Sequence, residues 1–142
     1  MTGLWNKGIL EDFKIDHDPN NIIKNLTFTF AGQNLSIVYQ DGCTYVGKGV
    51  KYDNRIVKND VGIFNNPKLH YEYNGEWFKD KRHGTAKVFV NGILTFSGTF
   101  ENDRKKKGKL VKGGFVYDGD WDENGVFTGK RKTFNNELTL SN

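Results

Sequence analysis

The sequence predicts an all-β protein of consecutive antiparallel β-hairpins, stacked as a twisted ribbon without a long helix. Three observations support this fold class. The phrase aromatic-x-Gly-x-aromatic occurs at residues 73–77, 96–100 and 117–121, with central glycines 98 − 75 = 23 and 119 − 98 = 21 residues apart, and such a spacing is typical of a repeat array. Glycine is frequent (17 of 142 residues) while proline is rare (2 residues), which argues against a disordered linker. Apolar residues do not recur at helical spacing.

The length and composition fit one domain spanning residues 1–142. Eleven Phe, six Tyr and three Trp residues supply the apolar surface to be buried. The net charge of +4 is mild, and it permits contact with phosphates or acidic partners. Lysine outnumbers arginine and asparagine is abundant, which suggests AT-rich coding DNA, as in many protists, some bacteria and large DNA viruses.

The single cysteine, Cys43, excludes a disulfide within the chain and fits a reducing compartment. The segment Met1 to Phe13 contains Asp and Glu and has no long apolar run, so it does not resemble a signal peptide. No stretch approaches the ~20 apolar residues of a membrane span. We expect an intracellular, cytoplasmic protein, with a virion or a membrane-peripheral position as the alternatives.

In the first half of the chain, alternation of apolar and polar residues predicts strands, and residues that favour tight bends predict the turns between them. The expected strands are 9–15, 26–30 and 33–39, and the expected turns are 17–21 and Asp41-Gly42. Residues 51–69 are the least regular part, with a turn at 52–55, short strands at 56–57 and 61–64, and a break at 65–67. Because Gly47 and Gly75 are 75 − 47 = 28 residues apart, the array either carries an insertion here or restarts.

From Tyr71 onward the hairpin pattern is regular. We expect strands at 71–77, 83–90, 94–100, 109–112 and 115–121, and a last strand containing Leu138 and Leu140 in the tail 134–142. Polar loops are expected at 79–82 and 101–108, and tight turns at Asn91-Gly92, Gly113-Gly114 and Asn124-Gly125.

The repeated glycine needs a packing reason, because glycine weakens a strand. Side chains alternate along a strand, so Tyr73, Gly75 and Trp77 share one face. We expect rings from neighbouring strands to lie across the glycine backbone, where a Cβ atom would clash. Well-placed aromatic pairs add roughly 0.5–1.5 kcal/mol to their burial. The phrase therefore indicates a structural ladder of rings.

These motifs resemble the MORN (membrane occupation and recognition nexus) repeat, whose pattern is roughly Y-x-G-x-W, then H-G-x-G and an Asn/Asp-Gly turn. The best copy has Tyr73-x-Gly75-x-Trp77, His83-Gly84 and Asn91-Gly92, with Ala86 in place of a second glycine. The copies at 96–114 and 117–131 are similar but degraded. The resemblance implies structural roles for Tyr73, Gly75, Trp77, Gly84, Gly92, Phe96, Gly98, Phe100, Tyr117, Gly119 and Trp121.

The clear repeats cover about residues 71–134, and divergent copies over 1–70 would include Tyr45-x-Gly47, Phe30-x-Gly32 and Gly3-x-Trp5. The resemblance implies a ribbon of antiparallel hairpins. The alternative fold is an unrelated β-barrel with glycine-rich turns.

The sequence contains no convincing catalytic, cofactor or metal site. We expect His83 to be a structural strand residue, and Cys43 to be a partly buried small apolar residue. Residues 118–122 resemble the start of a calcium loop, but Glu123 replaces its required glycine and Gly129 stands where its bidentate glutamate belongs. We therefore expect no enzyme activity, and a solvated outer face for those aspartates.

The concentrated charge is basic, and its five candidate anion-binding residues are Arg104, Lys105, Lys106, Lys107 and Lys109. They could bind phosphoinositide head groups, an acidic protein surface or nucleic acid. The other reading is a solvated hairpin loop whose charge prevents aggregation. Nearby acidic residues at 101, 103 and 118–122 favour that second reading.

We therefore expect a non-enzymatic structural or scaffolding protein without a cofactor. Its partners would be other proteins, or itself as a dimer or within a large assembly, such as a large DNA virus particle or a cytoskeletal scaffold. The alternative is a peripheral membrane module that binds anionic phospholipid head groups through the basic segment. Nucleic acid is not the expected partner.

Overall fold

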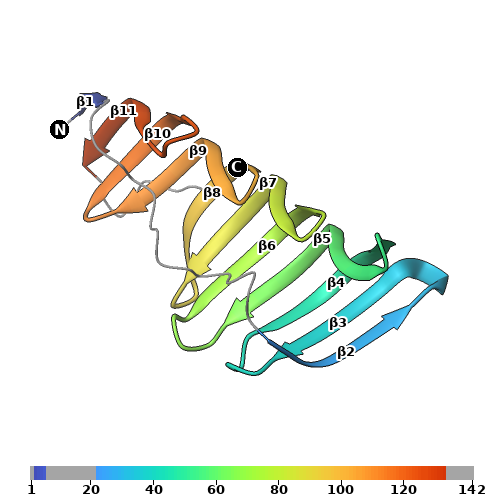
Figure 1. The fold of residues 1–142 in the computed structure, drawn as a ribbon. Helices are drawn as coiled ribbons and strands as arrows, with labels where there is room; N and C mark the ends of the chain where they lie inside the picture. The colour runs from blue at the N-terminus through green and yellow to red at the C-terminus, as the bar shows by residue number, and fades with distance from the viewer. Residues whose placement is uncertain (1, 6–21, 134–142) are drawn as a thin grey trace.

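The protein forms a single open antiparallel sheet (Figure 1). The structure is a computed structural model that describes residues 2–5 and 22–133. Ten consecutive strands, β2 to β11, each pair with the next one along the chain, and β1 adds to the far end of the sheet beside β11. The strands are β1 (Thr2–Trp5), β2 (Ile23–Thr29), β3 (Asn34–Tyr39), β4 (Thr44–Tyr52), β5 (Arg55–Asn66), β6 (Tyr71–Phe78), β7 (Lys81–Val90), β8 (Ile93–Glu101), β9 (Arg104–Lys112), β10 (Phe115–Trp121) and β11 (Phe127–Thr133).

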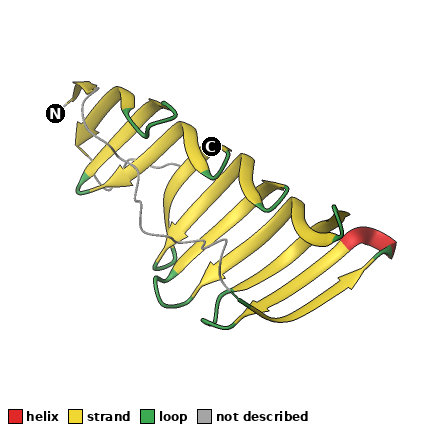
Figure 2. Ribbon diagram, viewed as in Figure 1, coloured by secondary structure: helices red, strands yellow, loops and turns green. Residues whose placement is uncertain are grey.

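The all-β hairpin ribbon expected from the sequence is confirmed. The sheet has two ends and is not closed, so the barrel alternative is wrong. Among the described residues, the one helical element is the short 3₁₀ turn Ala31–Gln33 (Figure 2). The expected elements at 9–15, 17–21 and 134–142 lie outside the described residues.

The tight turns were predicted well because their residue types favour left-handed backbone. Asn91 and Gly92 have φ of 54° and 76°, and Asp53 and Asn54 have φ of 52° and 64°. Positive φ at both central residues matches the right-handed twist of the flanking strands.

Three segments were wrongly predicted. The expected loop at 79–82 is only a two-residue turn, because β7 begins at Lys81. The expected loop at 101–108 is mostly strand, because β9 begins at Arg104 and only Asn102 and Asp103 form the turn. Residues 51–69 contain one continuous strand of 12 residues, β5, instead of two short strands. At Asp60 the backbone takes a φ of 74°, and a strand continues through such a local irregularity.

The wide glycine spacing between Gly47 and Gly75 comes from a longer hairpin. Strands β4 and β5 pair out to Tyr52 and Arg55, beyond the reach of the later hairpins. The array therefore neither restarts nor breaks at this point.

Two of the divergent copies expected before residue 70 are wrong. Gly32 lies in the 3₁₀ turn, outside any strand. Gly3 pairs with Arg131, so it stands out of register with the repeat glycines, which align with Gly129. The copy at Tyr45-x-Gly47 is in register with the later repeats.

The core is a row of side chains that crosses the sheet at one level. Strand pairing aligns one residue from each strand in this row, and all eight from β3 to β10 are buried. They are Ile37, Tyr45, Phe64, Tyr73, Val88, Phe96, Leu110 and Tyr117. The hydroxyls of Tyr45 and Tyr73 donate to the carbonyls of Lys48 and Glu76. Both acceptors sit where the strand register shifts, so each phenol satisfies a carbonyl displaced by a bulge.

Edge-to-face ring contacts connect neighbouring hairpins. Trp77 contacts Tyr45 and Tyr73, with ring centroids 5.4 and 4.8 Å apart, and Tyr73 contacts Phe100 of the next hairpin at 5.1 Å. The series continues through Phe96, Trp121, Phe127 and Tyr117. The ladder of rings joins every hairpin from β4 to β11.

A row of glycines lies beside the core row on the same face of the sheet, two residues away from it along each strand. It runs Gly47, Gly62, Gly75, Ala86, Gly98, Gly108, Gly119 and Gly129. A Cβ atom added at Gly98 would lie 2.7 Å from the Cα of Gly108, and one at Gly119 would lie 2.7 Å from the Cα of Gly129. The partner backbone therefore excludes most side chains here. A ring is the nearest obstacle only at Gly62, where Tyr45 lies against the backbone.

We predict that Gly98→Ala destabilises the protein by about 1–3 kcal/mol, because the added methyl group forces two strands apart. Ser97→Ala is the matched control, since Ser97 alternates to the opposite face, and should change stability by less than about 0.5 kcal/mol. Urea unfolding of both variants measures the difference. Equal midpoints for Gly98→Ala and Ser97→Ala would contradict the close approach of the strands.

Candidate functional site

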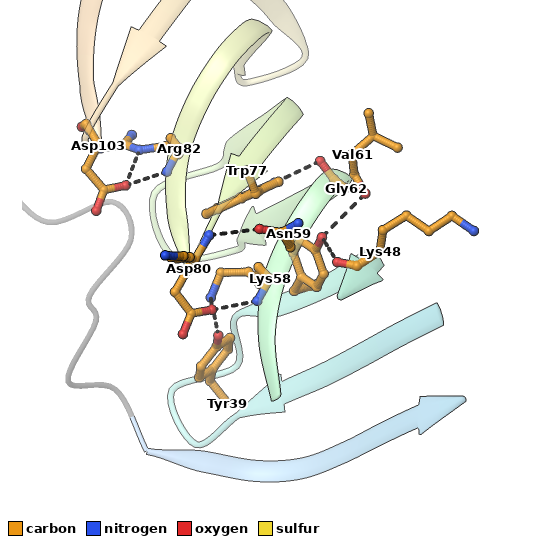
Figure 3. A network of polar contacts seen from close by, with 12 residues as sticks. Tyr39, Lys48, Lys58, Asn59, Val61, Gly62, Trp77, Asp80, Arg82 and Asp103 are labelled. Carbon is orange, nitrogen blue, oxygen red and sulfur yellow. Dashed lines mark hydrogen bonds and ion pairs between the residues drawn. The ribbon is translucent and has the colours of Figure 1, made fainter. Parts of the chain in front are cut away.

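A buried lysine of β5, Lys58, packs against the turn of the β6–β7 hairpin (Figure 3). Lys58 is 3% exposed, and its Nζ lies 2.9 Å from the hydroxyl of Tyr39 and 3.3 Å from the carboxylate of Asp80. The rings of Tyr39, Tyr45 and Trp77 surround this ammonium group at 5.3–5.7 Å from their centroids. Cation–π attraction and the carboxylate together offset the cost of removing the charge from water.

The backbone of Lys58 is bound by the same carboxylate. Its N–H donates to Oδ1 of Asp80 at 2.7 Å, and the N–H of Asp80 donates back to its carbonyl at 2.8 Å. We call this reciprocal arrangement a clasp. It ties the turn of one hairpin to the strand of the preceding hairpin.

The next hairpin repeats the clasp with an arginine. The N–H of Arg82 donates to Oδ1 of Asp103 at 2.8 Å, and the N–H of Asp103 donates to the Arg82 carbonyl at 3.0 Å. The guanidinium group donates to the hydroxyl of Tyr71 at 2.7 Å and lies over the ring of Phe100. Figure 3 shows the Arg82–Asp103 pair beside the Lys58–Asp80 pair.

The β10–β11 turn is organised differently. Asp122 accepts hydrogen bonds from the N–H groups of Asn124 and Val126 within its own turn. Asn124 stands three residues after Trp121, where the earlier hairpins have Asp80 and Asp103 after Trp77 and Phe100. The series of clasps therefore ends with the Arg82–Asp103 clasp.

Burial raises the pKa of three other groups, the hydroxyls of Tyr45 and Tyr73 and the thiol of Cys43. Burial raises the pKa of the Tyr45 and Tyr73 hydroxyls well above their usual range, so both phenols stay protonated at neutral pH. Burial, together with the neighbouring Asp41 carboxylate, raises the pKa of the Cys43 thiol to about 12. Cys43 is buried, which agrees with the expectation of a small core residue.

The two described histidines and the aspartates at 118 and 120 lie in turns or strands of the sheet. The ring of His83 lies 5.7 Å from the ring of Phe78. His70 occupies a turn with a φ of 51°. Asp118 and Asp120 are exposed strand residues opposite Lys109 and Lys107. Among residues 2–5 and 22–133, no group of three or more metal-ligating side chains gathers.

Ten of the eleven repeat residues named from the sequence lie in strands of the sheet, and Gly92 lies in the β7–β8 turn. The six rings of Tyr73, Trp77, Phe96, Phe100, Tyr117 and Trp121 are buried. Gly75, Gly98 and Gly119 belong to the glycine row. Gly84 and Gly92 take φ of 96° and 76°, a backbone region that favours glycine.

The five basic candidates do not form one patch. The register shifts at Lys106, which pairs with the exposed carboxylate of Glu101 at 2.8 Å. Lys105 instead faces the ring ladder, with its Nζ 5.6 Å from the centroid of Phe96. Lys107 and Lys109 alternate to the opposite side of the sheet. A hollow of about 480 Å³ beside Arg104 has both basic and acidic walls.

We call the side of the sheet opposite the ring ladder the outer face. One row on this face crosses all ten hairpin strands, in register, through Thr27, Ser36, Val46, Ile63, Asn74, Lys87, Ser97, Lys109, Asp118 and Lys130. The outer face carries exposed apolar side chains among polar ones at β3–β5, and mostly charged side chains at β9–β11.

The apolar end of the outer face carries four exposed large side chains. Val38, Val46, Val61 and Ile63 are 37%, 62%, 49% and 39% exposed. A shallow hollow of about 470 Å³ lies over Val46, Val61 and Ile63, lined also by residues of β2, β3 and β6. We call these four residues the outer apolar patch. Contiguous apolar surface of this kind marks interaction sites more often than isolated apolar residues do.

Sequence reasoning missed this patch and the lysines that join the outer face. Lys130 and Lys132 of β11 share the face with Lys107 and Lys109. Strand alternation contained the signal, since every second residue of a half-buried strand points outward. Applying the alternation to β9 required knowing that a bulge at Lys106 interrupts it.

Comparisons with known proteins add no identification. No family model matches the chain. No curated protein matches it either.

No helix among the described residues is long and apolar enough to span a membrane.

We predict that Asp80→Ala destabilises the protein by about 2–3 kcal/mol, because it leaves the buried Lys58 ammonium without its carboxylate. The double variant Lys58→Met/Asp80→Ala should recover part of this loss, since methionine fills the same space without a charge. Glu101→Ala, which removes the exposed partner of Lys106, is the matched control and should leave the urea midpoint unchanged. A double variant no more stable than Asp80→Ala alone would contradict the role given to the buried charge.

Proposed function

We propose that this protein is a non-enzymatic structural protein of the MORN-repeat type, which binds other proteins through the outer face of its sheet. The observation that carries this proposal is the difference between the two faces. One face is filled by the ring ladder, while the other exposes the outer apolar patch over a shallow hollow. A chain that leaves Val46 62% exposed beside other apolar residues has surface suited to a partner.

The repeat geometry supports the proposed family. The central glycine of each aromatic-x-Gly-x-aromatic phrase lies in one row across the sheet, and the Asn91-Gly92 turn closes a hairpin. The resemblance implies a scaffold of stacked hairpins, and the ten-strand meander is consistent with it. The Asn- and Lys-rich composition favours a large DNA virus particle or a cytoskeletal scaffold as the assembly.

The partner surface we propose is a protein with an apolar centre and a polar rim. Val46 and Ile63 lie directly opposite each other on β4 and β5, and Thr27, Ser36 and Asn74 continue their row to either side. An apolar centre bordered by hydrogen-bonding residues is the usual composition of a protein interface.

We predict that Val46→Asp/Ile63→Asp abolishes capture of the native partner while the fold is retained. Two carboxylates placed opposite each other would have to be desolvated at the centre of the interface. Thr85→Asp/Thr99→Asp is the matched control, because this pair is also opposite on the outer face but lies outside the patch. Quantitative affinity capture from the source, read by mass spectrometry, compares the variants. Retention of the same partner by the Val46→Asp/Ile63→Asp variant would contradict the proposal.

A second candidate function is contact with an anionic surface. Lys107, Lys109, Lys130 and Lys132 gather on β9 and β11 of the outer face, with Asp118 and Asp120 between them on β10. The cluster is more basic than acidic, which supports binding of anionic phospholipid head groups. It replaces the contiguous basic segment expected from the sequence.

We predict that changing these four lysines to glutamine weakens co-sedimentation with phosphatidylserine vesicles, if the second function holds. Each lysine near such a surface contributes about 1 kcal/mol, and the effect falls as salt is raised. The charge-matched control changes four exposed lysines located elsewhere, Lys24, Lys51, Lys68 and Lys81. Equal sedimentation of the two variants would exclude a specific lipid-binding role for the outer face.

A further inference from the structure

We propose that β1 of one copy pairs with β11 of a second copy, so that ribbons join end to end by exchanging their N-terminal strands. The starting observation is the strand order. β1 lies at one end of the sheet and β2, the next described strand in the chain, lies at the other (Figure 1). All other neighbours in sequence are also neighbours in the sheet.

The covalent connection between β1 and β2 must cross the whole sheet if both belong to one copy. Ten strand spacings separate them in an 11-stranded sheet, which is about 48 Å at about 4.8 Å each. Successive strand pairs along the glycine row place Trp5 of β1 at the same height across the sheet as Phe28 of β2. Ile23 lies five residues before Phe28, toward the start of β2. The straight-line separation from Trp5 to Ile23 is therefore about 50 Å.

Pairing within one copy would hold that connection close to full extension. Eighteen residue steps join Trp5 to Ile23, and a chain of this length reaches at most about 60–65 Å. A flexible chain of the same length has a root-mean-square span of only about 25 Å. Stretching it to twice that span lowers the effective concentration of β1 at β11 of its own copy. The edge of β11 in a second copy then becomes a competing site.

Exchange removes this strain while keeping every strand pair. β1 is antiparallel to β11, and nine reversals separate β11 from β2, so β1 and β2 run in the same direction. When β1 sits on a neighbouring copy, the connection needs only to return along one strand to reach its own β2. That return is about 20 Å, well within the span of a relaxed chain.

The two ends of the ribbon have the properties that such joining needs. Without β1, β11 would present a row of unpaired backbone groups, and open edges of this kind readily template another strand. At the opposite end, β2 is itself an edge strand. Ile23, its first residue, is 44% exposed, and Ile22 and Phe30, which flank the strand, are 61% and 71% exposed. The exchanged β1 would bring the β2 end of the donor next to the β11 end of the acceptor.

The inference extends the proposed structural role by naming a second copy as a partner, but it uses the ends of the sheet and not the outer face. The test is a disulfide between register partners. Leu4 and Lys130 stand directly opposite each other on β1 and β11, so Leu4→Cys/Lys130→Cys in a Cys43→Ala background places one new pair of thiols across the junction. The spacing of opposite residues on paired strands permits a disulfide.

We expect oxidation of the full-length variant to give disulfide-linked dimers and longer chains on a non-reducing gel, in a fraction that rises with protein concentration. An internal disulfide within the monomer at every concentration would overturn the proposal, and so would the absence of any cross-link. Asp120→Cys/Thr128→Cys is the matched control. These residues pair within the β10–β11 hairpin, so their disulfide must form inside one chain.

Deleting residues 8–12 separates the two topologies directly. Thirteen residue steps then remain between Trp5 and Ile23, and they reach at most about 43–47 Å. This is shorter than the separation of about 50 Å that pairing of β1 with β11 within one copy requires. Exchange predicts that the cross-link between copies persists in this deletion variant, and its loss would overturn the proposal. Adding Val46→Asp/Ile63→Asp should leave the cross-link unchanged. Failure of the outer-face proposal and failure of strand exchange therefore give different results.

Discussion

The structure depends on the close approach of neighbouring strands along the glycine row. At Gly98 and Gly119 the Cα of the partner strand occupies the space that a side chain would need. This contact brings the large rings on either side of the row within edge-to-face distance of one another. Residues 2–5 and 22–133 form one sheet without a second layer, so the burial among them comes from packing along the sheet itself. The glycines make that packing possible, and the rings supply the apolar area.

The clasps and the ring ladder stabilise different parts of each hairpin. The ladder joins hairpins along the core row, while Asp80 and Asp103 tie the turn ends to the preceding strands. The buried cations of Lys58 and Arg82 serve both, since each contacts an aromatic ring and a carboxylate. A lost carboxylate leaves an unpaired charge inside the ladder, so these ion pairs contribute to stability.

Sequence reasoning reached the fold because the repeat, the turns and the strand alternation all report local preferences. The Asn91-Gly92 turn and the rings at Tyr73 and Trp77 needed only local information. The prediction of one basic patch at residues 104–109 failed for a different reason. A bulge at Lys106 sends neighbouring lysines to different sides of the sheet, and a bulge depends on how two strands pair. The outer apolar patch and the β1–β11 pairing were also missed, because both depend on contacts between segments distant in the sequence.

The division between the faces also limits where a partner can bind. Side chains of the core row and the glycine row are constrained by their neighbours, so changing them costs stability before it changes recognition. Outer-face residues such as Val46 and Lys109 have no such constraint. An apolar residue kept exposed on that face gains nothing from the fold, since it stays in water. A ribbon that exposes apolar side chains on one face, and open strands at its ends, is therefore suited to association in two directions, across its face and along its length.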